Sequence, residues 1–535
     1  MIRVKEIITG LLMTPAFAIC FFGCTTPEQF KEQADEEVYT ILDQKWKDSF
    51  GYKANYKVTD GEPNALDVIK LIPPSGTLSQ AQAVGISTRY NRDYQNRKES
   101  LYLSALDLTS VRHQYARQWF GTIDAFYETS DGTEETPFNA QGGVNQQFLL
   151  GDGILIGAGL AVDWTRFLTG DPETSLASVL SATLEAPLLG NGAGKVAREN
   201  LTQAERNILY NIRSFNRYRK TFVVSIISDY YRVLQQKASV VIQKASYQRL
   251  VDSTNQLRME VEVGKRPAYD LAEAEQRLLS GEQGVVSAVQ SYEQVLDNFK
   301  IRLALPTDIE IQLDPNELRI LDVIGVDLPD YSAEEAIQIA LVQRLDLANV
   351  RDGLDDSERK LILAAEGLGP QVVFVAAANV ESTPDTELTR LRFHDGDYSL
   401  GIMADLPLDR VNQRNAYRES LINVRQQQRD YDEEIDKIKL QVRAAYREMV
   451  QTTESYRIQK IGLELAQKRV EVEKLSLQTG RGTVRLLLDS EDALVQAQND
   501  VVSALVDHMT AKLIFFRDVG ILRVLPDGMW EETKP

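Results

Sequence analysis

The chain has 535 residues, of which 43% are hydrophobic and 26% charged, so it can form several domains and is too apolar to be largely disordered. Its net charge of −19, from 59 basic and 78 acidic side chains, disfavours nucleic-acid binding, because such binding neutralises phosphates with Lys and Arg. The three histidines are far apart, and both cysteines, Cys20 and Cys24, lie in the first 24 residues. The sequence therefore predicts no enzyme activity and no metal or cofactor.

Residues 1–24 have the pattern of an export signal. Arg3 and Lys5 precede a broken apolar stretch that is too short for a membrane-spanning helix. The stretch ends at Gly23-Cys24, which resembles a bacterial lipoprotein cleavage box, so Cys24 is the expected lipid attachment site. A plain secretory signal with an incidental cysteine is the alternative. No later run of 18 apolar residues exists, so no transmembrane helix is expected.

The chain contains two copies of one unit. Pro187-Leu188 recurs as Pro407-Leu408, and in both copies an Arg-Glu pair follows at the same spacing. Val263–Pro267 corresponds to Thr479–Thr483, and Leu78-Ser79 corresponds to Tyr331-Ser332. The matches occur in the same order, which indicates an internal duplication. The first copy holds extra residues between its first helix and its Pro-Leu pair.

Each copy has the periodicity of three helices. Apolar residues recur every three or four positions from Val424 to Leu477, which predicts a long helix packed against others. A helix of that size is about 100 Å long, and the other two are about half as long. The expected bounds are 79–116 and 331–366 for the leading helices, 195–262 and 412–479 for the long helices, and 268–304 and 483–518 for the return helices.

Between each leading and long helix the period changes to two, which predicts strands. The alternating runs lie near 119–128 and 176–188 in the first copy and near 370–382 and 398–408 in the second. The hairpin 142–165 also alternates, and the sequence leaves open whether it joins the sheet or forms an external loop. Each run suits a tilted membrane strand of about 9–11 residues. A soluble hairpin capping a helical rod is the alternative.

Four to six strands per chain cannot close a barrel, since single-chain barrels begin at eight. An open sheet edge in lipid would leave N–H and C=O groups without partners. We therefore expect several copies to share one barrel. With four strands each, three copies give twelve strands, and the same symmetry arranges their helices as a hollow cylinder.

The expected organisation along the chain has six parts. The second part, residues 25–77, contains an apolar stripe formed by Phe30, Val38, Ile41, Leu42 and Trp46. The parts are a signal peptide (1–24), an N-terminal periplasmic extension (25–77), a first repeat (78–305, strands within 118–188 and helical hairpin 195–304), an equatorial linker (306–330), a second repeat (331–525, strands within 371–408 and helical hairpin 412–518) and a C-terminal tail (526–535).

This order of elements resembles the TolC-type outer membrane efflux proteins over residues 78–525. The resemblance implies a mostly α-helical fold with a membrane β-barrel portion, in which a homotrimer builds an α-barrel and a shared β-barrel. It implies a location in the outer membrane of a Gram-negative-type bacterium, extending into the periplasm. The implied function is the passive exit duct of a tripartite efflux or type I secretion system, working with a periplasmic adaptor and an inner-membrane pump. A non-conducting, coiled-coil envelope-tethering lipoprotein is the alternative.

The resemblance places adaptor docking at the tips of the helical hairpins. Gly264 and Asp270 match the family's first tip, and the tips are basic on an acidic protein. Ordinary charged turns, with glycines relieving strain, are the alternative. The expected docking residues are Gly264, Lys265, Arg266, Asp270, Gly480, Arg481, Thr483 and Arg485.

The family's entrance constriction corresponds to Asp270, Leu486 and Asp489. The second hairpin of the best-known member carries two carboxylates there, so only Asp489 is retained in this chain. Residues that hold that member's gate shut correspond to Leu477 and Gly482, and the same lock is therefore not expected. Three copies of Asp489 would form a ring that favours cations, and a solvated helix residue is the alternative.

Overall fold

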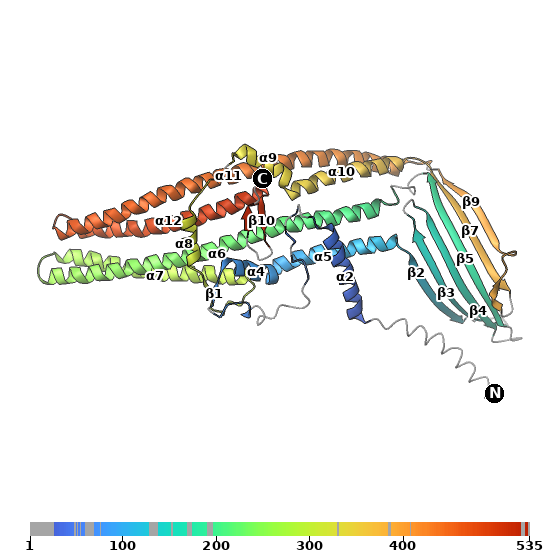
Figure 1. Ribbon diagram of the computed structural model, residues 1–535, viewed down its shortest axis with the longest axis horizontal. Helices are drawn as coiled ribbons and strands as arrows, with labels where there is room; N and C mark the ends of the chain where they lie inside the picture. Colours follow the sequence, from blue (N-terminus) through green and yellow to red (C-terminus); the bar gives the residue numbers. More distant parts are fainter. Residues whose placement is uncertain are drawn as a thin grey trace, which may run out of the picture. The chain divides into compact units, whose positions relative to one another are not determined.

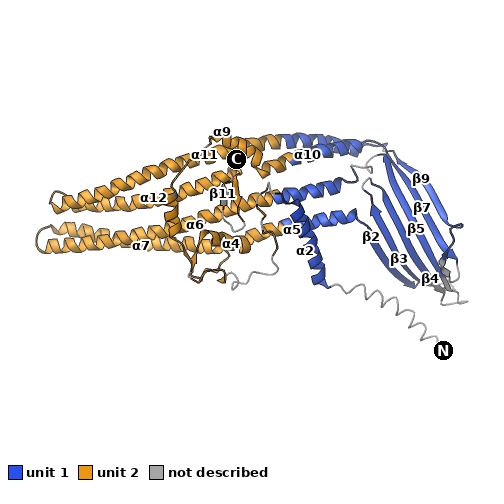
Figure 2. Ribbon diagram, in the orientation of Figure 1, with its two compact units in different colours: residues 1–46, 101–212, 352–428 blue, residues 47–100, 213–351, 429–535 orange. Residues whose placement is uncertain are grey.

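The computed structural model describes residues 26–47, 50, 52–53, 55–58, 69–74, 76–127, 137–150, 153–167, 174–189, 196–328, 331–383, 387–406, 408–525 and 530–532. The expected lipid attachment site, Cys24, lies outside these residues. Two compact units are present (Figure 2): unit 1 comprises 1–46, 101–212 and 352–428, and unit 2 comprises 47–100, 213–351 and 429–535. Each unit draws residues from both sequence repeats.

The two long helices and the two return helices of the repeats are present as predicted (Figure 1). Helices α6 (Glu199–Glu262) and α11 (Val411–Gln478) have 64 and 68 residues, or about 100 Å each. The return helices are α7 (Ala268–Arg302) and α12 (Val484–Val519). None of the helices in the described ranges combines the length and apolar character needed to cross a membrane.

Each leading helix is broken in two, which the sequence analysis did not predict. The first consists of α4 (Gln80–Tyr90) and α5 (Arg92–Gln114), and the second of α9 (Ala333–Gln343) and α10 (Leu345–Glu366). Both breaks have extended backbone, at Asn91 and Arg344.

Side chains compensate for the helical hydrogen bonds lost at these breaks. Asn91 accepts from the Tyr94 amide at 3.0 Å and donates to the Arg302 carbonyl at 2.8 Å. Arg344 donates to Asp346 at 3.0 Å and to Gln441 at 2.7 Å. The two breaks occupy corresponding positions in the repeats, and α4 and α9 begin with matching Ser-x-x-Gln and Ser-x-x-Glu capping boxes. The duplication therefore extends to details that helical periodicity does not encode.

The linker 306–330 contributes to unit 2 through one strand and one helix. β6 (Gln312–Leu313) pairs in parallel with β1 (Thr77–Leu78), and α8 (Asn316–Ile324) follows it. The Tyr456 hydroxyl donates to Asp322 on α8 at 2.5 Å, and the Tyr230 hydroxyl donates to the Leu78 carbonyl at 3.0 Å. These contacts attach the linker to α11 and the β1 strand to α6.

Helix α6 also holds terminal segments of the chain within unit 2. Asn216 donates to the Phe50 carbonyl at 2.6 Å, Arg219 to the Tyr52 carbonyl at 2.8 Å and Lys220 to the Gly520 carbonyl at 3.0 Å. Beyond Gly520, strands β10 (Leu522–Val524) and β11 (Trp530–Glu532) form a small antiparallel pair. One face of α6 thus binds main-chain carbonyls from a segment near the N-terminus and from a segment near the C-terminus.

The N-terminal extension forms α2 (Pro27–Lys45) in unit 1. Its predicted apolar stripe is confirmed for Val38, Ile41 and Leu42, which are buried, whereas Phe30 is exposed. The Tyr102 hydroxyl of α5 donates to Asp35 at 2.6 Å, and Lys45 forms an ion pair with Glu205 of α6. The helix is therefore packed on α5 and α6.

An antiparallel sheet dominates unit 1 (Figure 1). Its strand order is β2-β3-β4-β5-β7-β9, and a short strand, β8 (Glu387–Leu391), also pairs with the end of β7. The long strands are β2 (Gln118–Tyr127), β3 (Pro137–Leu149), β4 (Leu155–Phe167), β5 (Thr174–Leu189), β7 (Gln371–Thr383) and β9 (Asp397–Asp405).

The hairpin near 142–165, whose place the sequence left open, belongs to the sheet. It supplies β3 and β4, which lie between β2 and β5. β4 pairs with β5 from Leu155↔Glu185 to Arg166↔Thr174, so the hairpin is joined along its length. Within the described residues the chain contributes six long strands rather than four.

The buried histidine of unit 2 predicts a specific acid sensitivity. His508 is 3% exposed, its Nδ1 lies 3.3 Å from the Thr453 hydroxyl, and burial lowers its pKa from 6.5 to about 4, with Lys512 acting in the same direction. Between these pH values the unfolded chain binds a proton that the folded chain excludes. This contribution to stability is therefore complete above about pH 6.5 and is lost as the pH falls toward 4.

We expect His508→Gln to reduce the loss of thermal stability between pH 7 and pH 4.5, measured on detergent-purified protein. The wild-type loss attributable to this residue is at most about 3 kcal/mol. His394→Gln, at an exposed turn residue, is the matched control and should retain the wild-type pH profile. An unchanged profile in His508→Gln would assign the acid sensitivity to other groups.

Candidate functional site

The pairing register gives the sheet of unit 1 two chemically different faces. Residues opposite each other in a ladder share a face, and successive residues alternate between faces. One face, here called the apolar face, carries Trp119, Ile123, Tyr127, Val144, Phe148, Ile156, Leu160, Val162, Leu180, Leu184, Phe374, Val380, Tyr398, Leu400 and Ile402. Trp119 and Leu400, on the two edge strands, are 67% and 79% exposed in the single chain. An exposed apolar surface of this kind marks contact with lipid or another protein.

The opposite face, here called the polar face, is acidic. It carries amides, hydroxyls and glycines, interspersed with apolar residues such as Phe120, Val179, Val375 and Met403. Within the six long strands its positions include no Lys or Arg. Its carboxylates are Asp124, Asp163, Glu185, Glu381, Asp397 and Asp405.

Both outer strands of the sheet have an open edge within the described residues. β2 pairs only with β3, and β9 pairs only with β7. Open edges with apolar side chains favour pairing with another strand. The sheet therefore combines one apolar face, one acidic face and two edges available for pairing.

The two hairpin tips in unit 2 share one turn geometry. Gly264 and Gly480 have φ of +77° and +73°, which a residue with a side chain rarely adopts. At each tip the glycine amide donates three residues back and the next amide donates five residues back, to Val261 and Glu260 in the first and to Leu477 and Ser476 in the second. This is a Schellman motif, so the sequence-based reading of both glycines as helix-ending residues is confirmed.

The expected docking residues differ in what they contact. Lys265, Arg481 and Arg485 are exposed, and Thr483 caps α12 by accepting from the Leu486 amide at 3.4 Å. Leu486 is 43% exposed.

Arg266 and Asp270 lie inward instead. Arg266 donates to Glu260 at 2.9 Å and to the Leu477 carbonyl of the other hairpin at 3.0 Å, and it lies 3.7 Å from Asp270, which is buried. The hydrogen bond from Arg266 lowers the pKa of Glu260. Arg266 therefore links the two tips.

A second link joins the hairpins through Asp489. Arg277 on α7 donates to Asp489 on α12 at 2.7 Å and lies 3.0 Å from Asp492. Burial and the neighbouring Asp489 raise the pKa of Asp492, whereas Arg277 opposes this shift. The sequence did not indicate Arg277 or Asp492, because the partners are more than 200 residues apart and have no counterpart in the repeat.

An apolar cluster supports these polar links. Leu250 and Leu257 of α6 and Ala274 of α7 pack against Val484 and Leu488 of α12. Leu278 and Leu477 are packed against the cluster. The two tips are thus joined by burial and by two arginines that reach from the first hairpin to the second.

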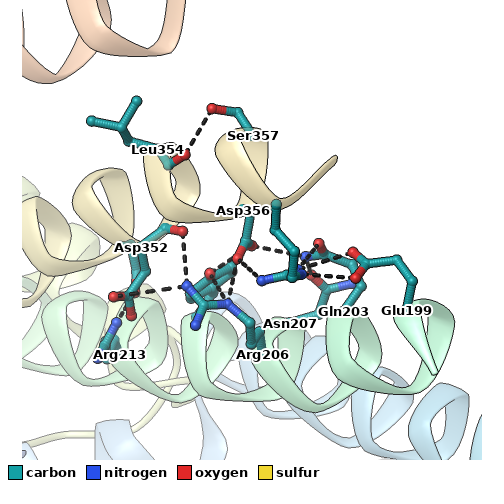
Figure 3. A network of polar contacts seen from close by, with 12 residues as sticks. Glu199, Gln203, Arg206, Asn207, Arg213, Asp352, Leu354, Asp356 and Ser357 are labelled. Carbon is teal, nitrogen blue, oxygen red and sulfur yellow. Dashed lines mark hydrogen bonds and ion pairs between the residues drawn. The ribbon is translucent and has the colours of Figure 1, made fainter. Parts of the chain in front are cut away.

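A polar network in unit 1 fastens α6 to α10 (Figure 3). Asp356 accepts from Tyr210 at 2.7 Å, from Gln203 at 3.0 Å and from Arg359 at 3.0 Å, and it forms an ion pair with Arg206. Burial alone would raise the pKa of Asp356, but these hydrogen bonds and the charge of Arg206 lower it. The carboxylate is therefore held ionised and positions two helices.

Comparison with known proteins agrees with this arrangement. The family model described as outer membrane efflux protein matches residues 336–512. No curated protein matches the chain by sequence. The match agrees with the predicted resemblance to outer membrane efflux proteins.

Solved outer membrane channels have a similar fold. The likeness to CusC has a TM-score of 0.60 at 14% identity and covers 82% of this chain and 92% of that chain. For CmeC of Campylobacter jejuni the TM-score is 0.58 at 12% identity, with 89% and 91% covered. For MtrE of Neisseria gonorrhoeae it is 0.59 at 13% identity, with 82% and 88% covered. At these identities the likeness establishes the fold.

The link between the hairpins can be tested with Arg277→Gln. This substitution removes the contacts to Asp489 and Asp492, so we expect the backbone amides of 484–492 to exchange with deuterium about fivefold faster, for a loss of about 1 kcal/mol. Arg258→Gln is the matched control, because Arg258 pairs with Glu275 at 2.9 Å inside the first hairpin. Equal exchange in both variants would show that Arg277 does not hold α12.

Proposed function

Because the chain has the fold of outer membrane channels and residues 336–512 match the outer membrane efflux protein family, we propose that it is the outer-membrane exit duct of a tripartite efflux or type I secretion system. The observation that carries the proposal is the sheet with an apolar face, an acidic face and two open edges. Such a sheet suits a wall between lipid and water, where side chains alternate between the two environments.

The open edges support a homotrimer. A lipid-exposed edge would leave the backbone groups of β2 and β9 without partners, so the edges of neighbouring copies pair with each other. β2 and β9 are the first and last of six antiparallel strands and run in opposite directions, so β9 of one copy and β2 of the next form an antiparallel pair. In this arrangement the polar faces surround the bore, and the helices of three copies form a periplasmic cylinder.

The charge of the polar face supports a preference for cations in the bore. Carboxylates lining a pore attract cations and repel anions. The six carboxylates of the polar face share it with no Lys or Arg of the six long strands, whereas Asp489 is already paired with Arg277. We therefore propose that the carboxylates of the polar face contribute more to cation selectivity than a ring of Asp489 does.

The exposed basic residues of the tips support docking of a periplasmic adaptor there. Lys265, Arg481 and Arg485 point outward, while Arg266 and Asp270 hold the turn. The adaptor surface that fits them is acidic. Transport then needs no chemistry by the duct, because an inner-membrane pump would supply the energy.

Conductance in planar bilayers separates this function from a non-conducting envelope tether. Purified protein should form discrete channels, and a gradient of potassium chloride should give a reversal potential of the sign expected for cation preference. Asp124→Asn combined with Asp163→Asn and Glu381→Gln should lower that preference by at least twofold. Removing three exposed charges of α2 (Glu32→Gln, Glu36→Gln, Glu37→Gln) is the control and should leave it unchanged. Protein that inserts but never conducts would favour the tether.

Adaptor docking can be tested by photocrosslinking in cells. A photoreactive residue at Lys265 or Arg481 should yield one shared adduct with a periplasmic protein, because both side chains are exposed on the tips. The same residue at Lys437, which is exposed near the middle of α11, is the control and should not yield that adduct. Adducts only with a second copy of this chain would contradict docking at the tips.

A further inference from the structure

We propose that the β3–β4 hairpin enlarges the exit, so that three copies form a continuous wall of eighteen strands instead of twelve. The inference rests on the proposed function, since it requires copies that share one wall. It concerns a different question, namely whether the additional hairpin belongs to that wall or lies outside it. The sequence left both possibilities open.

The hairpin is hydrogen-bonded on both sides along its length. β3 pairs with β2 from Gln118↔Gln147 to Tyr127↔Phe138, and β4 pairs with β5 from Leu155↔Glu185 onward. An external loop or a plug would leave β2 beside β5, and no such pairing is present in the described residues. Removing the hairpin would therefore break two complete ladders.

The hairpin has the same division of faces as the other strands. On the apolar face it carries Val144, Phe148, Ile156, Leu160 and Val162, and Leu160 is 48% exposed. On the polar face it carries Gln141, Asn145, Gln147 and Asp163. A strand that separates lipid from water requires this alternation, whereas a loop outside the membrane does not.

On the polar face, side chains of the neighbouring strands occupy the space beside two glycines of the hairpin. A Cβ at Gly157 would lie 2.5 Å from the Thr183 hydroxyl, and a Cβ at Gly159 would lie 2.7 Å from the Ser181 hydroxyl and closer still to the Asn145 side chain. The neighbouring side chains thus extend over positions where β4 has none. This complementarity links β4 to β3 and β5 specifically.

Strand number and direction allow closure. In a sheet of six antiparallel strands the two edge strands run in opposite directions, so three copies can join edge to edge through antiparallel pairs only. A sheet of four antiparallel strands would also allow this. Eighteen strands lie in the range of barrels that keep an aqueous channel open. Barrel diameter grows roughly in proportion to strand number, so the exit would be about 1.5 times as wide as one of twelve strands.

Disulfide trapping in the full-length protein, in outer-membrane vesicles, tests the position of the hairpin. Ala158 of β4 and Ala182 of β5 are register partners, so Ala158→Cys with Ala182→Cys should crosslink within one chain. Gly121→Cys with Ala182→Cys is the control, because two strands separate these positions by about 14 Å and no crosslink is expected. The native cysteines lie only at positions 20 and 24. A crosslink in the control but not in the first pair would overturn the inference.

An electron-microscopy reconstruction of the assembly then counts the strands. Eighteen strands around the bore would support the inference. A trimer with twelve strands and the hairpin outside the wall would refute it and leave the exit duct intact. Particles with no shared wall would refute the proposed function itself, so the two failures are distinguishable.

Discussion

A backbone N–H or C=O group in hydrocarbon needs a hydrogen-bond partner, and this requirement connects the sheet of unit 1 to everything proposed for the protein. The outer edges of β2 and β9 have no partner within the described residues, although their apolar face suits lipid. A single copy therefore does not meet the requirement. The proposed pairing between copies would meet it and would create a closed wall whose inner surface is the acidic face.

The helices rely on polar contacts at places where they meet other helices. In unit 1 the buried carboxylate of Asp356 joins α6 to α10, and in unit 2 Arg266 and Arg277 join the first hairpin to the second. Removing one partner of a buried pair leaves the other charge uncompensated, so the contacts of Asp356 and Arg266 fix one arrangement of the helices more strictly than apolar packing does. The partly exposed pair of Arg277 and Asp489 contributes less. The apolar cluster near Leu257 buries apolar surface between the two hairpins, and the two arginines fix how the hairpins are aligned along their length.

Periodicity sufficed to predict the long helices, and comparison of the chain with itself revealed the duplication and the two tip glycines. Periodicity did not reveal the breaks at Asn91 and Arg344, since the compensating hydrogen bonds come partly from distant residues such as Gln441. The position of the β3–β4 hairpin depends on pairing with β2 and β5, which alternation alone does not specify. The Arg277–Asp489 contact joins unlike positions of the two repeats, so self-comparison could not find it.

The hydrogen bond from Arg266 to residue 477 has an evolutionary consequence. Its acceptor is a main-chain carbonyl, which every amino acid provides, so the contact tolerates replacement of the Leu477 side chain. Covariation between aligned positions reports side chains that must change together, and this pair has no such obligation. Homologues can therefore retain this hydrogen bond whichever residue stands at position 477, and the constraint on the Leu477 side chain comes instead from its packing against the apolar cluster.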